Sequence, residues 1–168
     1  MEEEPNKLSA RRVLDDVKIA LERLDKESEE REIRITWYAT IAMLRTSFEV
    51  LKKVDAKRSE LIDKTVSDQW HRVKEQKEDN SIFWEFIKRE RELLVHQYEM
   101  SADLEFAPLA LVEDAAAELV YDDDGELYLQ DFFTICDGYF IGHDGRDLSR
   151  EGYNWVDQRV KEIETVLL

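Results

Sequence analysis

The chain has few of the residues that turn or cross-link a backbone. Its 168 residues include five glycines, two prolines and one cysteine. So few glycines and prolines favour helices over a turn-rich β fold. The single cysteine, Cys136, cannot form an internal disulfide, which fits a reducing cytosol. We expect Cys136 to fill a small apolar space rather than to act as a nucleophile.

Long apolar runs are also absent, and the first residues, Met-Glu-Glu-Glu-Pro, are unlike a signal peptide. These two absences predict a cytoplasmic protein that does not enter a membrane. Seven Phe, six Tyr and four Trp can supply a sizeable core, and the length is that of one domain.

Positive charge is scarce in the second part of the chain. Residues 1–96 contain 20 Lys and Arg against 22 Asp and Glu, whereas residues 97–168 contain 4 against 18. We therefore expect a helical core over residues 1–105 and an acidic extension over residues 106–168, packed as part of the same domain. An acidic surface repels nucleic-acid phosphates and suits docking to a basic partner or mimicry of a nucleic acid.

The spacing of apolar residues predicts a mainly α fold, a bundle of four or five helices with a small C-terminal β-hairpin. Four helices are expected in the first part of the chain, over residues 9–30, 33–54, 59–77 and 80–100. Ser9 is the expected cap of the first, and Asn80 or Ser81 that of the fourth. The charged segment 25–34 is either a turn or a solvated continuation of the first helix.

Pro108 ends the helical region, because proline lacks the amide donor and disfavours helical geometry before it. We expect a short helix over residues 109–119, followed by a hairpin in which 119–121 pairs with 127–129 around an Asp-Gly turn. Residues 132–141 extend this sheet. Asp147 or Ser149 then caps a last helix that runs to the C-terminus.

One helix combines a core-like face with residues that can do chemistry. Over residues 80–100, six apolar side chains recur at helical spacing: Ile82, Phe83, Phe86, Ile87, Leu93 and Leu94. The same segment carries Arg91, His96 and Tyr98 in the pattern Arg-x-x-x-x-His-x-Tyr.

This pattern resembles the signature of the HEPN superfamily, helical-bundle proteins of prokaryotic defence and toxin systems. The likeness is closest to the branch whose members act as toxins beside a nucleotidyltransferase antitoxin. The resemblance implies a homodimer with facing motif helices and a metal-independent endoribonuclease that needs no cofactor and cleaves RNA. Glu92 departs from the family, which usually carries Asn, Asp or His directly after the arginine.

In a ribonuclease of this kind each residue has a defined role. His96 would act as general acid and base, since the unperturbed imidazole pKa of about 6.5 lies near working pH. Arg91 would stabilise the phosphate charge that builds up during cleavage. The resemblance implies that Tyr98 positions substrate or is modified by the partner nucleotidyltransferase. Glu92 lies one turn before His96 and can orient or charge its imidazole.

The geometry of a helix separates the two main residues. Arg91 and His96 diverge by about 140° on an ideal helix of 3.6 residues per turn. A second subunit or the hairpin segment would have to bring them into one cleft.

Three alternatives remain open. Lys88–Glu92 and Glu92–His96 can be ordinary helix-surface pairs, with Arg91 solvated and Arg45 merely solvated or paired. The chain can instead be a non-catalytic acidic interaction protein that binds a basic partner. It can also be an inactive HEPN homologue, since Glu92 puts negative charge beside the phosphate site.

No metal site is expected. Aligned on a calcium-binding loop, Asp122, Asp124 and Gly125 fit, but Val120 and Asp131 occupy positions that need other ligands. No Cys or His pair has the spacing of a zinc site. Four further residues could hold an ion only by a chance of the fold: Asp137, His143, Asp144 and Asp147.

Overall fold

The computed structural model describes residues 7–108, 110–113, 116–121, 123–127 and 129–167. Most of the chain is helical: α1 (Ser9–Leu24), α2 (Glu30–Lys53), α3 (Glu60–Glu75), α4 (Arg89–Gln97) and α5 (Gly145–Val166). Three short helical segments join them: η1 (Asp55–Arg58), η2 (Glu78–Asn80) and η3 (Ile82–Lys88). Between α4 and α5 lie β1 (Ala102–Pro108), β2 (Ala110–Glu113), β3 (Ala116–Leu119) and β4 (Leu129–Ile135). The prediction of a mainly α fold is confirmed.

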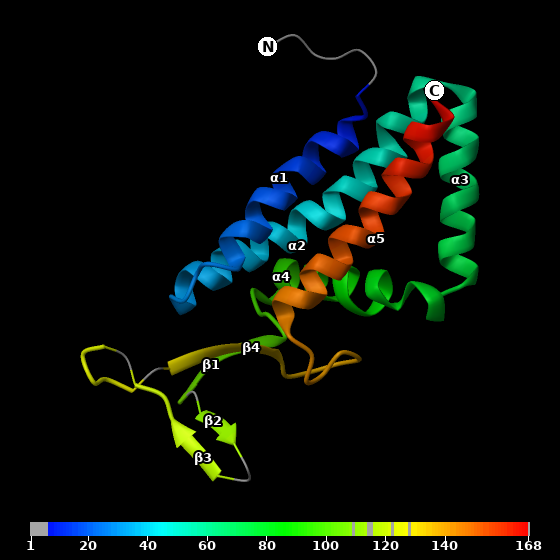
Figure 1. Ribbon diagram of the computed structural model, residues 1–168. Helices are drawn as coiled ribbons and strands as arrows, with labels where there is room; N and C mark the ends of the chain where they lie inside the picture. Colours follow the sequence, from blue (N-terminus) through cyan, green and yellow to red (C-terminus); the bar gives the residue numbers. More distant parts are fainter. Residues whose placement is uncertain (1–6, 109, 114–115, 122, 128, 168) are drawn as a thin grey trace.

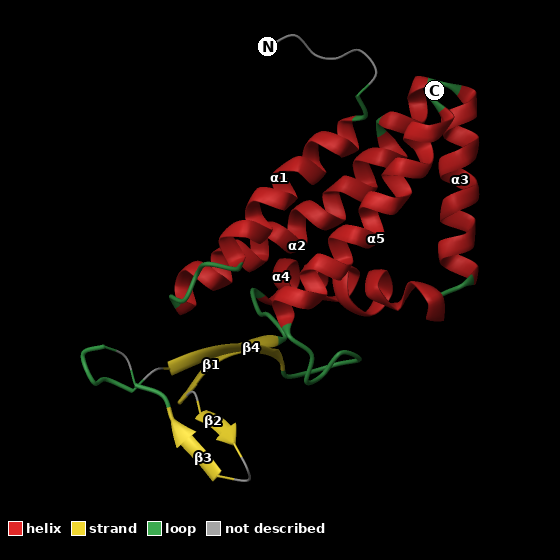
Figure 2. Ribbon diagram, viewed as in Figure 1, coloured by secondary structure: helices red, strands yellow, loops and turns green. Residues whose placement is uncertain are grey.

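The helices form one bundle, and the strands project from one end of it as an arm (Figures 1 and 2). We call residues 102–135 the β-arm. The helices α1 and α2 pack as an antiparallel hairpin, and α5 returns from the β-arm to pack against α1, α2 and α3. The expected division at residue 105 falls within β1, and α5, from the acidic extension, lies in the bundle.

Aromatic rings connect helices that are distant in sequence. The ring of Trp37 on α2 meets Phe86 of η3 and Phe133 of β4 edge-on, with centroids 5.6 and 5.0 Å apart. Phe48 and Trp155 meet in the same way at 5.3 Å, which joins α2 to α5. Such contacts add to the free energy gained from burying the rings. The core therefore includes residues from both ends of the chain.

The first helix is capped from a distance. Ser9 was the expected cap, but Leu8 occupies that position and makes no side-chain cap bond. The fully buried carboxylate of Asp55, in η1, instead accepts hydrogen bonds from the amides of Ser9 and Ala10, each 2.8 Å long. A carboxylate suits this end of a helix because it satisfies free amides and faces the positive end of the helix dipole.

The motif helix has two parts, π-helical η3 and α-helical α4. Four of the predicted core residues are buried, namely Ile82, Phe83, Phe86 and Ile87. The other two, Leu93 and Leu94, are half-buried, so the apolar face of the motif helix becomes less buried along α4. Ser81 occupies the N-cap position but makes no side-chain cap bond, and the Asn80 side chain binds residues of α5 instead.

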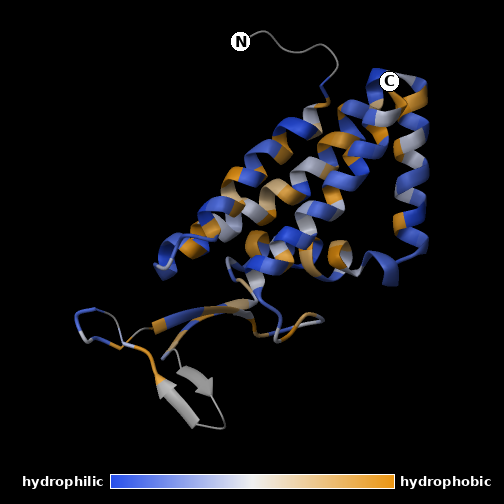
Figure 3. Cartoon of the chain, in the orientation of Figure 1, coloured by the Kyte–Doolittle hydropathy of each residue, from blue (hydrophilic) through white to orange (hydrophobic). Residues whose placement is uncertain are grey.

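The β-arm begins with a sheet anchored in the bundle. Strands β1 and β4 pair antiparallel from Ala102 with Ile135 to Pro108 with Leu129. On the face toward the helices, Ala102, Phe133 and Ile135 are buried, whereas Phe106 and Leu129, farther out, are more than half exposed. The apolar face therefore continues past the edge of the bundle. Figure 3 shows hydrophilic residues at the tip of the loop between β3 and β4.

The position of the hairpin and one helix were predicted wrongly. The hairpin lies mid-chain, between 102 and 135. Of the expected pairing of 119–121 with 127–129, the described residues form a single bridge, Tyr121 with Leu127, and residue 128 lies outside the described ranges. Instead of a helix over 109–119, β2 and β3 pair with each other. Pairing of Pro108 with Leu129 closes the connection between β1 and β4 into a loop, within which β2 and β3 fold back on each other.

Two smaller predictions also need correction. Cys136 is exposed rather than an apolar filler, and its thiol contacts the Thr134 carbonyl oxygen at 3.3 Å. The last helix is capped by Asp144, which accepts from the Asp147 amide, and not by Asp147 or Ser149. Across the described ranges, no helix is both long enough and apolar enough to cross a membrane.

Candidate functional site

The motif arginine lines a groove between α2 and α4. Arg91 reaches this groove from α4 together with Leu94 and Val95, and the opposite wall is α2, with Arg45, Glu49 and Lys53 among its residues. The groove has a volume of about 380 Å³. It is large enough for a phosphate group and part of a nucleotide.

Arg45 is fixed in the wall of the groove. Its guanidinium lies over the ring of Phe83, 5.1 Å from the centroid, and forms an ion pair with Glu49 one turn along α2. Burial lowers the pKa of Arg45, Glu49 raises it, and the charge of nearby Arg91 lowers it again. The atom Nη1 is buried and has no hydrogen-bond partner among the residues that the structure describes. Arg45 is therefore a desolvated cation beside a second cation.

The groove carries more positive than negative charge. Lys53 forms a second ion pair with Glu49, 2.7 Å long, so one carboxylate serves two cations. Arg45, Lys53 and Arg91 thus face Glu49 as the acid in the lining. This balance is opposite to that of the whole chain, whose net charge is −16. An anion placed between Arg91 and Lys53 would reduce the repulsion among the cations.

His96 lies near the end of α4, away from the groove. Its side chain is exposed, and among the described residues it forms no hydrogen bond or ion pair. It is not among the residues that line the groove with Arg91. Because α4 is regular over these residues, the expected divergence of the two side chains holds for this helix.

Tyr98 ends the motif helix in a left-handed conformation, with φ of 56°. Its carbonyl oxygen accepts a hydrogen bond from the Tyr38 hydroxyl at 3.0 Å, and the two rings lie 5.2 Å apart. Burial raises the pKa of Tyr38, and the neighbouring Tyr98 adds to that rise. The Tyr98 side chain itself is 66% exposed, so it is accessible to substrate or to a modifying enzyme.

Glu92 has a partner other than His96. Its carboxylate lies 3.1 Å from the Lys88 ammonium one turn earlier, an exposed pair of the kind that contributes little to stability. Arg91, His96 and Tyr98 are not joined to one another by any hydrogen bond within the described part of the chain. A single copy therefore presents them as three separate groups.

A polar network connects α4 to the base of the β-arm. The buried carboxylate of Glu90 accepts hydrogen bonds from the amide and the hydroxyl of Ser101. Arg89, beside it, forms an ion pair with Asp137, just past β4. These contacts fix the orientation of the β-arm relative to the motif helix.

The sequence alone does not assign Arg45, Glu49 and Lys53 to a site. Their spacing at i, i+4 and i+8 does indicate one helix face. It does not indicate which helix faces them, because that depends on how α4 crosses α2. Within the described ranges, no group of three or more His, Cys, Asp or Glu side chains is placed to hold a metal ion.

Comparison with known proteins found no matching family model, no matching curated protein and no matching solved structure.

Proposed function

We propose that the protein is a metal-independent endoribonuclease of a toxin or defence system, with its site on α4. In this proposal Arg91 stabilises the charge on the scissile phosphate, His96 transfers protons, and Tyr98 positions RNA or is modified. The HEPN-like pattern supports these roles. The observation that carries the proposal is the cationic groove in which Arg91 lies with Arg45 and Lys53.

The proposal needs two copies of the chain. Arg91 and His96 point in different directions on α4, so one copy does not bring both to a single phosphate. The exposed surface at the end of α4 includes Val95, at the edge of the groove, and Tyr98, just after the helix, whose side chains are 55% and 66% exposed. A second α4 packed there would cover this apolar surface and bring His96 of one copy toward Arg91 of the other.

Cleavage of total RNA in excess EDTA tests the proposal. Wild-type protein should produce fragments, and His96→Ala and Arg91→Ala should each abolish them. His71→Ala and Arg31→Ala are matched controls, because both residues are exposed and lie on other helices. Cleavage that persists in both site variants would refute the site, and a folded wild type without cleavage would refute the activity.

A second function is favoured by the charge of the β-arm. The β-arm, residues 102–135, contains 10 Asp and Glu and no Lys or Arg. Exposed apolar side chains lie on the same arm, including Phe106, Tyr121 and Phe132. We propose that the β-arm binds a basic protein partner, such as a nucleotidyltransferase antitoxin, through long-range attraction and apolar contacts.

Charge reversal on the β-arm tests this second function. The probe is a polylysine peptide, and the readout is its affinity at several salt concentrations. Asp103→Lys with Glu105→Lys, on β1, should weaken binding and flatten its salt dependence. Asp16→Lys with Glu22→Lys on α1 changes the net charge equally and should weaken binding much less. Equal effects of the two pairs would show that net charge, not the β-arm, attracts the peptide.

A further inference from the structure

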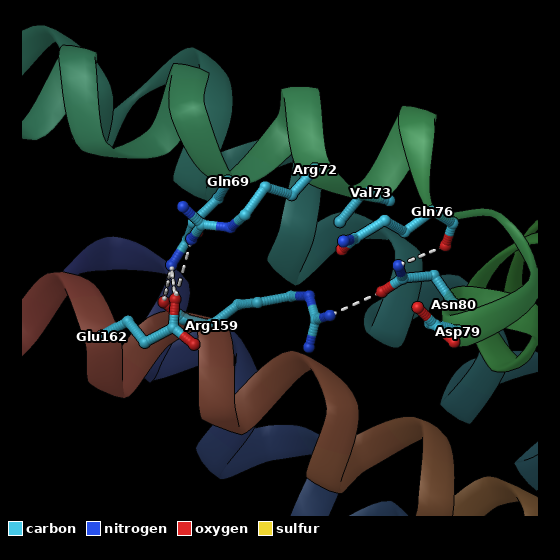
Figure 4. Close-up of a pocket in the computed structure, with 8 residues that line it drawn as sticks. All are labelled: Gln69, Arg72, Val73, Gln76, Asp79, Asn80, Arg159 and Glu162. Atoms are coloured by element: carbon cyan, nitrogen blue, oxygen red, sulfur yellow. Dashed lines mark hydrogen bonds and ion pairs between the residues drawn. The ribbon is translucent and has the colours of Figure 1, made fainter.

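A second pocket lies between α3 and α5, on residues that the α2–α4 groove does not use. Figure 4 shows Gln69, Arg72, Val73 and Gln76 above it, Arg159 and Glu162 below it, and Asp79 and Asn80 closing one end. Its volume is about 170 Å³, enough for a small molecule but not for a nucleotide.

Arg159 extends along this pocket and is held rigidly. Its guanidinium stacks on the indole of Trp155, with Cζ 3.6 Å from the ring centroid. It donates to the Trp155 carbonyl oxygen at 2.9 Å and to Asn80 Oδ1 at 2.6 Å, as Figure 4 shows for the latter. Asn80 is itself fixed, since it accepts from Trp155 Nε1 and donates to the Gln76 carbonyl oxygen. This chain of contacts preorganises the guanidinium.

The charge of Arg159 is not neutralised by an ion pair. Both of its acceptors are neutral oxygens, and among the described residues no carboxylate lies within ion-pair distance of it. Burial lowers the pKa of Arg159 to about 10, with Glu162 raising it and Arg72 lowering it, so the group remains charged at neutral pH. Partly buried cations are normally paired, because desolvation is costly without a counter-charge.

Arg72 supplies a second cation on the α3 side. Its guanidinium lies 3.5 Å from Glu162, whose carboxylate also accepts from Gln69 Nε2 at 2.8 Å. The carboxylate of Glu162 is therefore bound by residues of α3 and forms no ion pair with Arg159. An oxyanion in the pocket would approach the remaining N–H donors of Arg159 and would also be attracted by Arg72.

The acidic residues around the pocket limit the charge of the ligand. Asp79 lies on the rim, and within the described part of the chain its carboxylate has no partner. Together with Glu162 it would repel a multiply charged anion more than a singly charged one. A planar carboxylate also matches the fork of guanidinium donors.

We propose that the pocket between α3 and α5 binds a small molecule through a single carboxylate group, held by Arg159 and attracted by Arg72. This inference is independent of ribonuclease activity and of the β-arm, because neither shares a residue with the pocket.

Titration of the intact protein with acetate, followed by NMR of the indole N–H groups, tests the proposal. The Trp155 indole should shift saturably, because its N–H group shares Asn80 Oδ1 with Arg159. The Trp37 indole, which lies against Phe86 and Phe133, should not shift. Inorganic phosphate at equal ionic strength should bind more weakly than acetate.

Substitutions of Arg159 and Arg72 test whether these two residues bind the acetate. Arg159→Gln should weaken acetate binding by roughly tenfold or more, as expected for loss of charge-assisted hydrogen bonds. Arg72→Gln should weaken it by several-fold, and Asp79→Asn should strengthen it. Arg150→Gln is the matched control, an exposed arginine on the same helix that pairs with Asp25 and Asp147, and should change nothing.

Several results would overturn the proposal. One is a folded wild type whose Trp155 indole shows no saturable shift with acetate. Phosphate binding more tightly than acetate would contradict the carboxylate assignment. Should Arg159→Gln not fold, Arg72→Gln decides alone, since Arg72 is largely exposed and unchanged affinity in that variant would refute the site.

Discussion

The carboxylate of Asp55 and the backbone amide of Ala10 form a hydrogen bond of 2.8 Å across 45 residues of sequence. The same carboxylate binds the amide of Ser9, and its side chain is completely buried. One residue, the first of η1, thus determines where α1 begins. It also ties α1 to η1 through polar contacts.

We expect Asp55→Ala to lower the free energy of unfolding by about 2–4 kcal/mol, because two buried amides lose a charged acceptor. Asp55→Asn should cost less, since one oxygen remains. Urea denaturation measures both. The control is Asp68→Ala on the exposed face of α3, which should change stability by less than about 0.5 kcal/mol. Equal stability of Asp55→Ala and wild type would show that water replaces the cap.

Stability should fall in acid partly through Asp157. Burial raises the pKa of this carboxyl, but hydrogen bonds from Lys161 and Arg11 lower it more, so its net pKa is below the usual value. A lowered folded-state pKa gives stability that is present above the unfolded-state pKa, about 3.9, and is lost as the pH falls through the folded-state value. This loss should occur below about pH 4.

The variant Asp157→Asn isolates this contribution. It should be less stable than wild type at neutral pH, and the difference should shrink as the pH falls below about 4. Urea denaturation at a series of pH values measures it. Asp68→Asn, exposed on α3, should follow wild type throughout. A difference that stays constant with pH would mean that Asp157 contributes by packing rather than by charge.

Mixing two inactive variants should restore ribonuclease activity if the site is shared between copies. Arg91→Ala supplies His96, and His96→Ala supplies Arg91, so a mixed dimer contains one complete site. Random mixing should give about one quarter of wild-type cleavage in a symmetric dimer. Cleavage in EDTA is compared with each variant alone. Wild-type activity without recovery in the mixture would place both residues of one site on the same copy.

A side chain at Gly138 should strain the backbone and displace the guanidinium of Arg89. The φ of Gly138 is +89°, and an added Cβ would lie 2.7 Å from the guanidinium carbon of Arg89, the residue paired with Asp137. Gly125, with φ of +79°, has nothing within 4 Å of the same position and serves as the control. Both alanine variants should lose about 1–2 kcal/mol from backbone strain.

Only Gly138→Ala should also displace Arg89 and loosen the β-arm. Limited proteolysis should therefore cut the arm faster in Gly138→Ala than in Gly125→Ala, while urea denaturation measures the loss of stability in each. Equal cleavage of the two variants would show that the Arg89 contact does not hold the arm.

Local patterns predicted most of the helices. The apolar stripe of α2 and the charged segment after α1 suffice to place both, because helix periodicity depends only on neighbouring residues. The cap of α1 could not be found in this way. Ser9 fits the local rule, whereas Asp55, which does the capping, is brought there by the tertiary fold.

In the β-arm, local helix propensity likewise failed to predict the structure. Residues 110–119 are rich in alanine and leucine, which favour a helix, yet 110–113 pair as a strand with 116–119, inside the connection between β1 and β4. The groove around Arg91 also depends on tertiary packing and cannot be predicted from local patterns. Arg45 and Lys53 belong to it only because α4 crosses α2 at their level.

Because the β-arm is attached to the bundle at its base, its outer part can tolerate insertions and deletions. Bonds at its base hold the arm, such as that from the Ser101 hydroxyl to the Glu90 carboxylate, while Phe106 and Leu129 already lie outside the core. Closing a longer connection between α4 and α5 costs little, about 0.6 kcal/mol for each doubling. The outer part of the arm is therefore a place where insertions and deletions can accumulate while the bundle stays intact.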